Sequence, residues 1–94
     1  MNVRGSTHIG LVSRNVTVNG RRTSMRLEPL MWDALHEMAA REGGTVNDVI
    51  SEVDRKRGDL GLTAAVRIRL LEYFRIACTE DGHARVGHGT FWRR

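Results

Sequence analysis

The chain has little of several residue types: one cysteine, one proline and five aromatic side chains in 94 residues. Cys78 has no second cysteine to pair with, which excludes a scaffold held by internal disulfides and fits a reducing compartment. No apolar run approaches the roughly 18 residues that span a bilayer, and the N-terminus lacks the apolar stretch typical of a signal peptide. We therefore expect a cytoplasmic protein that makes no membrane contact.

Acidic residues are absent from the first 27 positions, which hold five arginines and therefore carry a charge of +5. The rest of the chain holds ten basic and eleven acidic residues, a balance of −1, so the N-terminal segment carries all the excess in the net charge of +4. The flat, permanently charged guanidinium group suits phosphate oxygens and guanine edges. This distribution predicts a polyanionic partner, and double-stranded DNA fits it.

Residues 15–27 show the pattern of a β-hairpin. Two β-prone runs flank Asn19 and Gly20, a dipeptide that favours a two-residue type I′ turn. The predicted cross-strand pairs are Val18 with Arg21, Thr17 with Arg22, and Val16 with Thr23. One face then carries Val16, Val18, Arg21, Thr23, Met25 and Leu27, and the opposite face carries Asn15, Thr17, Arg22, Ser24 and Arg26. The second face is wholly polar, so we expect it to point to solvent.

Three helices are expected after the hairpin. Pro29 suits the first turn of a helix, and Gly43 and Gly44 end it. Thr45 to Asp48 resembles a capping box that opens the second helix. Thr63 is expected to cap a third helix that runs to about Ala77 and is apolar around most of its circumference. The sequence therefore indicates a flexible arm over 1–14, one domain over 15–77 and a flexible tail over 78–94.

The order of strand, helix, two-glycine turn and capped helix resembles the ribbon-helix-helix superfamily of MetJ, Arc and CopG-type repressors. The residues that carry the resemblance are Arg22 to Pro29, Gly44 to Ile50, Trp32, Ala34, Leu35, and Leu71 to Phe74. They are most similar to a bacterial subgroup in which a hairpin precedes the strand and a third helix follows. The resemblance implies a mainly α fold with a short β-ribbon, and an intertwined homodimer with an intermolecular antiparallel ribbon and an additional C-terminal helix.

The family resemblance also implies roles for individual residues. In the family, alternate side chains on the outer face of the ribbon contact bases in the major groove, which implies base contacts for Arg22, Ser24 and Arg26. In the family, the start of the second helix also lies against the DNA backbone. The residues expected to contact phosphates here are Arg21, Thr17, Thr45, Val46 and Asn47. The residues expected in the core or the dimer interface are Met25, Leu27, Trp32, Leu35, Val49, Ile50, Val53, Leu70, Leu71 and Phe74.

The expected function is a sequence-specific transcriptional regulator, a repressor that occupies an operator as a homodimer, with adjacent dimers on successive half-sites. The alternative is an antitoxin-like or adapter protein whose third helix and C-terminal tail bind another protein. A structural homodimer without nucleic acid is a third reading. The arm from Asn15 to Val18 leaves one question open, because a hairpin beside the dimeric ribbon makes a four-stranded unit that is wide for one groove.

No enzyme, metal site or cofactor is expected. The four histidines have no nucleophile or carboxylate at a catalytic spacing. Cys78, His83 and His88 have a regular spacing that matches no common zinc module.

Overall fold

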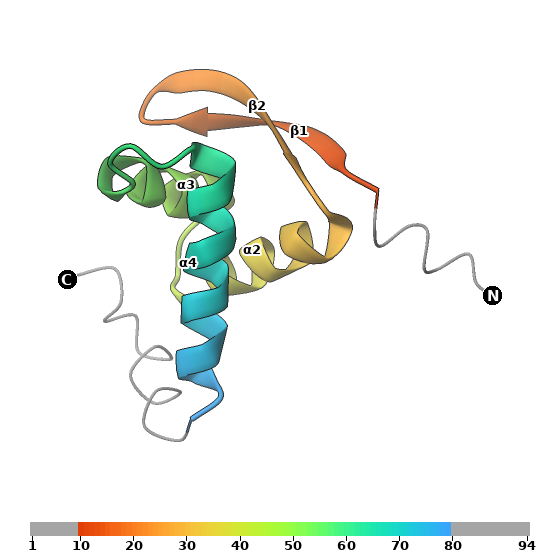
Figure 1. The fold of residues 1–94 in the computed structure, drawn as a ribbon, viewed down its shortest axis with the longest axis vertical. Coiled ribbons are helices and arrows are strands. Elements are labelled where there is room, and N and C mark those ends of the chain that lie inside the picture. The colour runs from red at the N-terminus through yellow and green to blue at the C-terminus, as the bar shows by residue number, and fades with distance from the viewer. Residues whose placement is uncertain (1–9, 80–94) are drawn as a thin grey trace.

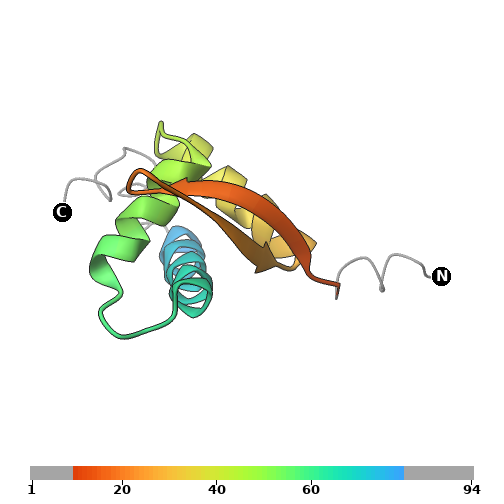
Figure 2. The ribbon, with the colours of Figure 1, turned by 90° about the horizontal axis from the view of Figure 1, so that it is seen from above.

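The computed structural model describes residues 10–79. Within this range, five elements follow one another: β1 (Val12–Val18), β2 (Arg21–Leu27), α2 (Pro29–Arg41), α3 (Val46–Lys56) and α4 (Leu62–Ala77). The hairpin lies on one side of the helices, and α4 runs away from it (Figures 1 and 2). The mainly helical fold with a short antiparallel hairpin agrees with the sequence analysis. Residues 1–9 and 80–94, which include most of the expected arm and tail, lie outside the described residues.

The hairpin has the predicted turn and register. Asn19 and Gly20 both have positive φ, 50° and 83°, as a type I′ turn requires. The predicted pairs are all observed, from Val18 with Arg21 to Val16 with Thr23. The first strand begins at Val12, three residues before the expected start at Asn15. The additional residues at the start of β1 are held by Trp32, whose indole Nε1 donates a 2.9 Å hydrogen bond to the Val12 carbonyl. No local sequence pattern predicts this contact.

Helices α2 and α3 have the predicted ends. Pro29 is the first residue of α2, and Gly43 follows that helix with a φ of 74°. The Gly44 N–H donates to the Ala39 carbonyl, which satisfies an orphan carbonyl of the last turn. The capping box of α3 is complete: the Asp48 N–H donates to Thr45 Oγ1 at 3.1 Å, and the Thr45 N–H donates to Asp48 Oδ2 at 2.8 Å.

The prediction that Thr63 caps α4 is wrong. Gly61, and not Thr63, is the N-cap residue, and it has no side chain to accept a hydrogen bond. Helical bonding begins earlier than the pattern indicates, because the Ala65 N–H already donates to the Gly61 carbonyl at 2.9 Å. Thr63 therefore lies inside the first turn of α4.

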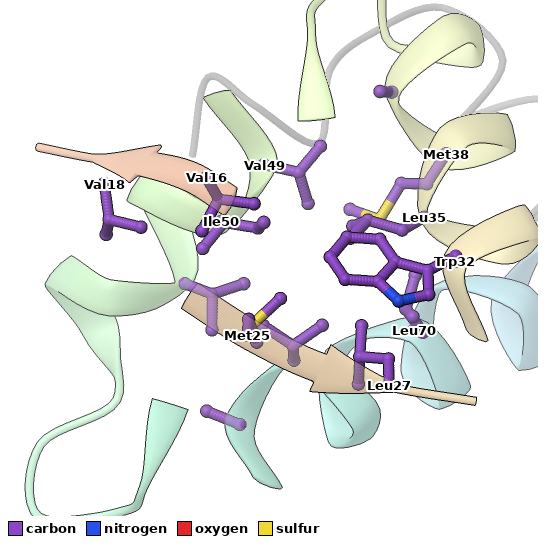
Figure 3. Close-up of a cluster of buried hydrophobic side chains, with 14 of the residues drawn as sticks. Val16, Val18, Met25, Leu27, Trp32, Leu35, Met38, Val49, Ile50 and Leu70 are labelled. Atoms are coloured by element: carbon purple, nitrogen blue, oxygen red, sulfur yellow. The ribbon is translucent and has the colours of Figure 1, made fainter. Parts of the chain in front are cut away.

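All five elements contribute to one hydrophobic core within the single chain (Figure 3). The predicted core residues that are buried are Met25, Leu27, Trp32, Leu35, Val49, Ile50, Val53 and Leu70. Phe74 is half-buried, with its ring edge against Tyr73. Leu71 is 62% exposed and lies outside the core of the single chain, so its place in a dimer interface stays a prediction. Elements of the same chain cover the buried side of α4, since α4 contacts α2, α3 and β2.

Candidate nucleic-acid interface

The outer face of the hairpin is polar along both strands. Its six residues, set by the register, are Ser13, Asn15 and Thr17 on β1 and Arg22, Ser24 and Arg26 on β2. Thr17 is half-buried and the other five are exposed. The opposite face buries Val16, Val18, Met25 and Leu27 against the helices. The predicted division of the two faces is therefore confirmed, and the longer β1 adds Ser13 to the polar face.

The outer face carries two cations and no carboxylate. Within residues 10–79, neither Arg22 nor Arg26 has an ion-pair partner. Ser13 and Ser24 join the strands through a 2.8 Å hydrogen bond between their hydroxyl oxygens. Asn15 pairs with Ser24 across the strands and has the two arginines at diagonal positions. The face thus offers guanidinium, hydroxyl and amide groups to a ligand.

The two edges of the hairpin have different surroundings. The Thr17 N–H points away from β2 and donates to Asn47 Oδ1 on α3 at 3.0 Å, so α3 closes part of the β1 edge. The alternation of an antiparallel ladder then directs the main-chain N–H groups of Arg22, Ser24 and Arg26 away from β1. These three residues make no main-chain hydrogen bond to another described element. The outer edge of β2 is open for strand pairing.

Asn19 fixes the tip of the hairpin to α3. Its N–H donates to Ser51 Oγ at 2.9 Å, and its amide Nδ2 donates to Asp54 Oδ2 at 3.0 Å. The pKa of Asp54 lies below its ordinary value. The hydrogen bond from Arg57 is the largest cause, and the hydrogen bond from Asn19 is the next. Arg21 contributes to this lowering through its charge. Because Arg21 pairs with Val18, it lies on the inner face of the hairpin and not on the polar face. Its charge is close enough to Asp54 of α3 to act on that carboxyl group.

The start of α3 lies beside β1. The capping box occupies Thr45 and Asp48, and the carbonyl oxygen of the Asn47 side chain accepts from Thr17. The main-chain N–H groups of Val46 and Asn47 have no partner in the described part of the chain, as expected for the first turn of a helix. Thr45 and Asn47 are exposed and Val46 is half-buried. The structure thus brings three predicted phosphate-contacting residues to the β1 side of the hairpin.

A residue that the sequence analysis did not single out lies in the same place. The Arg14 guanidinium carbon is 5.2 Å from the centroid of the Trp32 ring, although Arg14 is exposed and alternates toward the inner face. A hollow of about 550 Å³ lies between β1, α2 and the start of α3. Its polar lining residues are Arg14, Asn15, His36, Thr45 and Asn47. The only signal in the sequence was the position of Arg14 in the acid-free segment.

No group of three or more His, Cys, Asp or Glu side chains in residues 10–79 is placed to hold a metal ion, and Cys78 is exposed. His83 and His88 lie outside the described residues. None of the described helices is long and apolar enough to cross a membrane.

Comparisons with known proteins place the fold. A search of curated proteins found no significant match. Among solved structures, the chain is similar to an uncharacterized protein from Bordetella pertussis Tohama I, with a TM-score of 0.66 and 26% identity over 87% of this chain and 78% of that chain. The model of the ribbon-helix-helix domain, a type typical of DNA-binding regulators and antitoxins, matches residues 11–74. The observed hairpin and helices lie within the matched residues, and the chain belongs to the ribbon-helix-helix domain family.

Proposed function

We propose that this protein is a sequence-specific regulator of transcription, a repressor that binds double-stranded DNA in the cytoplasm. The observation that carries the proposal is the outer face of the hairpin, where Arg22 and Arg26 are exposed without a carboxylate partner in the described residues. Exposed guanidinium groups without a carboxylate partner can bind phosphate oxygens and guanine edges of DNA. Neutralising DNA phosphates with arginine also releases condensed counterions, which favours binding.

Base reading is assigned to three residues of β2. Arg22 and Arg26 each suit the O6 and N7 acceptors of guanine, and Ser24 between them can donate to or accept from several bases. Each good bidentate arginine contact discriminates against a wrong base by about 1–3 kcal/mol. Residues two positions apart in a strand are separated by about 6.6 Å, so Arg22 and Arg26, four positions apart, are separated by about 13 Å. This distance equals about four base-pair steps of 3.4 Å.

The proposed active form is a homodimer joined through β2. The unpaired N–H and C=O groups at Arg22, Ser24 and Arg26 match an antiparallel copy of the same strand. A two-fold axis between the two β2 strands makes the DNA site palindromic, and adjacent dimers bind successive half-sites. The two β2 strands form the central ribbon, and one β1 strand lies on each side of it.

The groove walls limit how this four-stranded unit docks. Neighbouring strands are about 4.8 Å apart, so β2 lies about 2.4 Å and β1 about 7 Å from the two-fold axis. The major groove is about 12 Å wide, or about 6 Å from its middle to each wall. The β2 strands therefore enter the groove, and the β1 strands lie over its walls. This position favours phosphate contacts for Thr17 and for Thr45, Val46 and Asn47 at the start of α3. Arg21, near Asp54, is assigned a phosphate contact at the hairpin tip.

A salt titration combined with site selection tests this proposal. The logarithm of the binding constant should fall linearly with the logarithm of salt concentration, with a slope near −0.9 per neutralised phosphate. Fragments recovered from a random duplex pool should share a palindromic motif, which Arg22→Ala loses. Arg75→Ala, which removes a cation from the last turn of α4, should retain the motif. A slope near zero, or recovery without a motif, would contradict sequence-specific binding.

A second candidate function is that of an adapter or antitoxin-like protein. The observation in its favour is a groove of about 960 Å³ between α3 and α4, bordered by the exposed Leu60 and Ile68. In this case α4 and the segment that follows it bind another protein. A double variant at the groove, Leu60→Ser with Ile68→Ser, decides between the two readings: the repressor function predicts unchanged operator binding with no lost partner, and the adapter function predicts loss of a co-purifying protein.

A further inference from the structure

Arg14 is a cation that the proposed base-reading surface does not use. It belongs to β1, where it pairs with Met25, and alternation directs it away from the outer face that carries Arg22 and Arg26. Its side chain is nevertheless exposed and has no carboxylate partner in the part of the chain that the structure describes. Neither core packing nor an ion pair accounts for an arginine at this position.

Trp32 holds the Arg14 side chain in place. The guanidinium lies 5.2 Å from the centroid of the indole ring, within the range of a cation–π contact. The indole is itself fixed, because it is 2% exposed and its Nε1 donates to the Val12 carbonyl two residues before Arg14. A guanidinium on a rigid ring loses little conformational freedom when it binds an anion.

The hollow beside Arg14 has the chemistry of an anion site. Arg14 and Asn15 on β1 and His36 on α2 supply donors, and residues 44–47 at the start of α3 also line the hollow. No Asp or Glu contributes to its lining. It has a volume of about 550 Å³ and is open to solvent, so it can admit a phosphate group that remains part of a DNA strand.

We infer that Arg14, held by Trp32, binds a DNA phosphate at the wall of the major groove. The inference rests on the proposed function, because it requires the β2 strands to occupy the groove. It assigns β1 a role distinct from that of β2: β1 and its hollow anchor the DNA backbone, and β2 reads the bases. The extra strand, which makes the ribbon too wide to enter the groove whole, is then part of the binding surface.

The test is the salt dependence of binding by Arg14→Gln, which keeps a planar group over Trp32 but removes the charge. Each dimer loses two phosphate contacts, so the slope of log K against log salt should become shallower by about 1.8. Binding should weaken equally on all duplexes, and the motif selected from a random pool should be unchanged. Arg14→Lys should keep the wild-type slope, and Arg75→Gln is the matched control for loss of one charge elsewhere.

Each outcome decides the inference. An unchanged slope in Arg14→Gln overturns it, as does a change in base preference at one position, which would place Arg14 in the groove. In both cases the proposed function stands if Arg22→Ala still loses the motif. If the wild-type protein shows no salt-dependent binding, the proposed function fails and this inference fails with it. Circular dichroism of each variant separates loss of contact from loss of fold.

Discussion

The hydroxyl of Tyr73 on α4 donates a 2.7 Å hydrogen bond to Oε2 of Glu42, the C-cap residue that follows α2. Both side chains are buried, and Oε1 of Glu42 has no hydrogen-bond partner. Tyr73 therefore supplies the one side-chain hydrogen bond that this buried carboxylate accepts from the described residues. The pair ties the third helix to the end of the first one.

Removing this hydroxyl should destabilise the domain. Tyr73→Phe leaves the ring in place but leaves both Glu42 oxygens buried without a partner, at a cost of about 1–3 kcal/mol in the free energy of unfolding. Urea denaturation monitored by circular dichroism measures the loss. Replacing both residues, as Tyr73→Phe with Glu42→Leu, should cost less than the sum of the single changes. Strict additivity would show that the pair does not interact.

The same pair predicts a loss of stability at alkaline pH. Burial, and then the hydrogen bond to Glu42, raise the pKa of Tyr73 above its ordinary value. A tyrosine whose pKa is raised by folding contributes stability that is present below the unfolded value of about 10 and is lost as the pH rises from there toward the folded pKa. The free energy of unfolding should therefore fall above about pH 10, more steeply in the wild type than in Tyr73→Phe. Parallel pH profiles for the two proteins would contradict the assignment.

The hairpin tip should depend on the Asn19 side chain. Asn19 has a φ of 50°, donates through its amide to Asp54 and accepts a 2.7 Å hydrogen bond from Arg55 Nη1. Asn19→Ala loses these contacts and strains the turn, and we expect a loss of about 1–3 kcal/mol in stability. Asn15→Ala, in the same hairpin but on the exposed outer face, should stay within about 0.5 kcal/mol of the wild type. Equal thermal shifts in the two variants would refute this account of the tip.

A proline on β2 should separate the fold of the chain from its dimerisation. Ser24→Pro removes an N–H that points away from β1, so the hairpin within the chain should persist and pairing with a second β2 should weaken. Sedimentation equilibrium should show a shift toward monomer, together with weaker DNA binding. Ser24→Ala, which keeps the N–H, should remain dimeric. A dimeric Ser24→Pro protein would place the dimer interface away from the β2 edge.

The capping box of α3 should contribute about 1 kcal/mol. Thr45→Ala removes the acceptor for the Asp48 N–H, and loss of an N-cap side chain costs about 0.5–2 kcal/mol. Thr45→Ser retains the hydroxyl and should restore most of the stability. Thermal unfolding of both variants without DNA measures the effect on the cap alone. If the serine variant is as unstable as the alanine variant, the methyl group rather than the hydrogen bond is responsible.

Local rules in the sequence predicted much of the secondary structure. Asn19 and Gly20 determined the turn, and the alternation around them determined the register and the two faces. Pro29, Gly43 and Thr45 marked the ends of helices through main-chain geometry and caps. Such signals act over two to four residues, so they can be read without the fold. The α4 start was misplaced because a threonine two residues inside the helix resembled a cap.

The sequence by itself therefore determined the elements, their order and the polar face of the ribbon. Only the tertiary structure decided which hairpin edge α3 covers, where β1 begins, how far Leu71 is exposed and that Arg14 lies on Trp32. These features depend on contacts between residues about 20 or more positions apart, such as Trp32 with Val12 and Asn47 with Thr17. The packing of whole elements brings such residues together, and no local pattern encodes which of them meet.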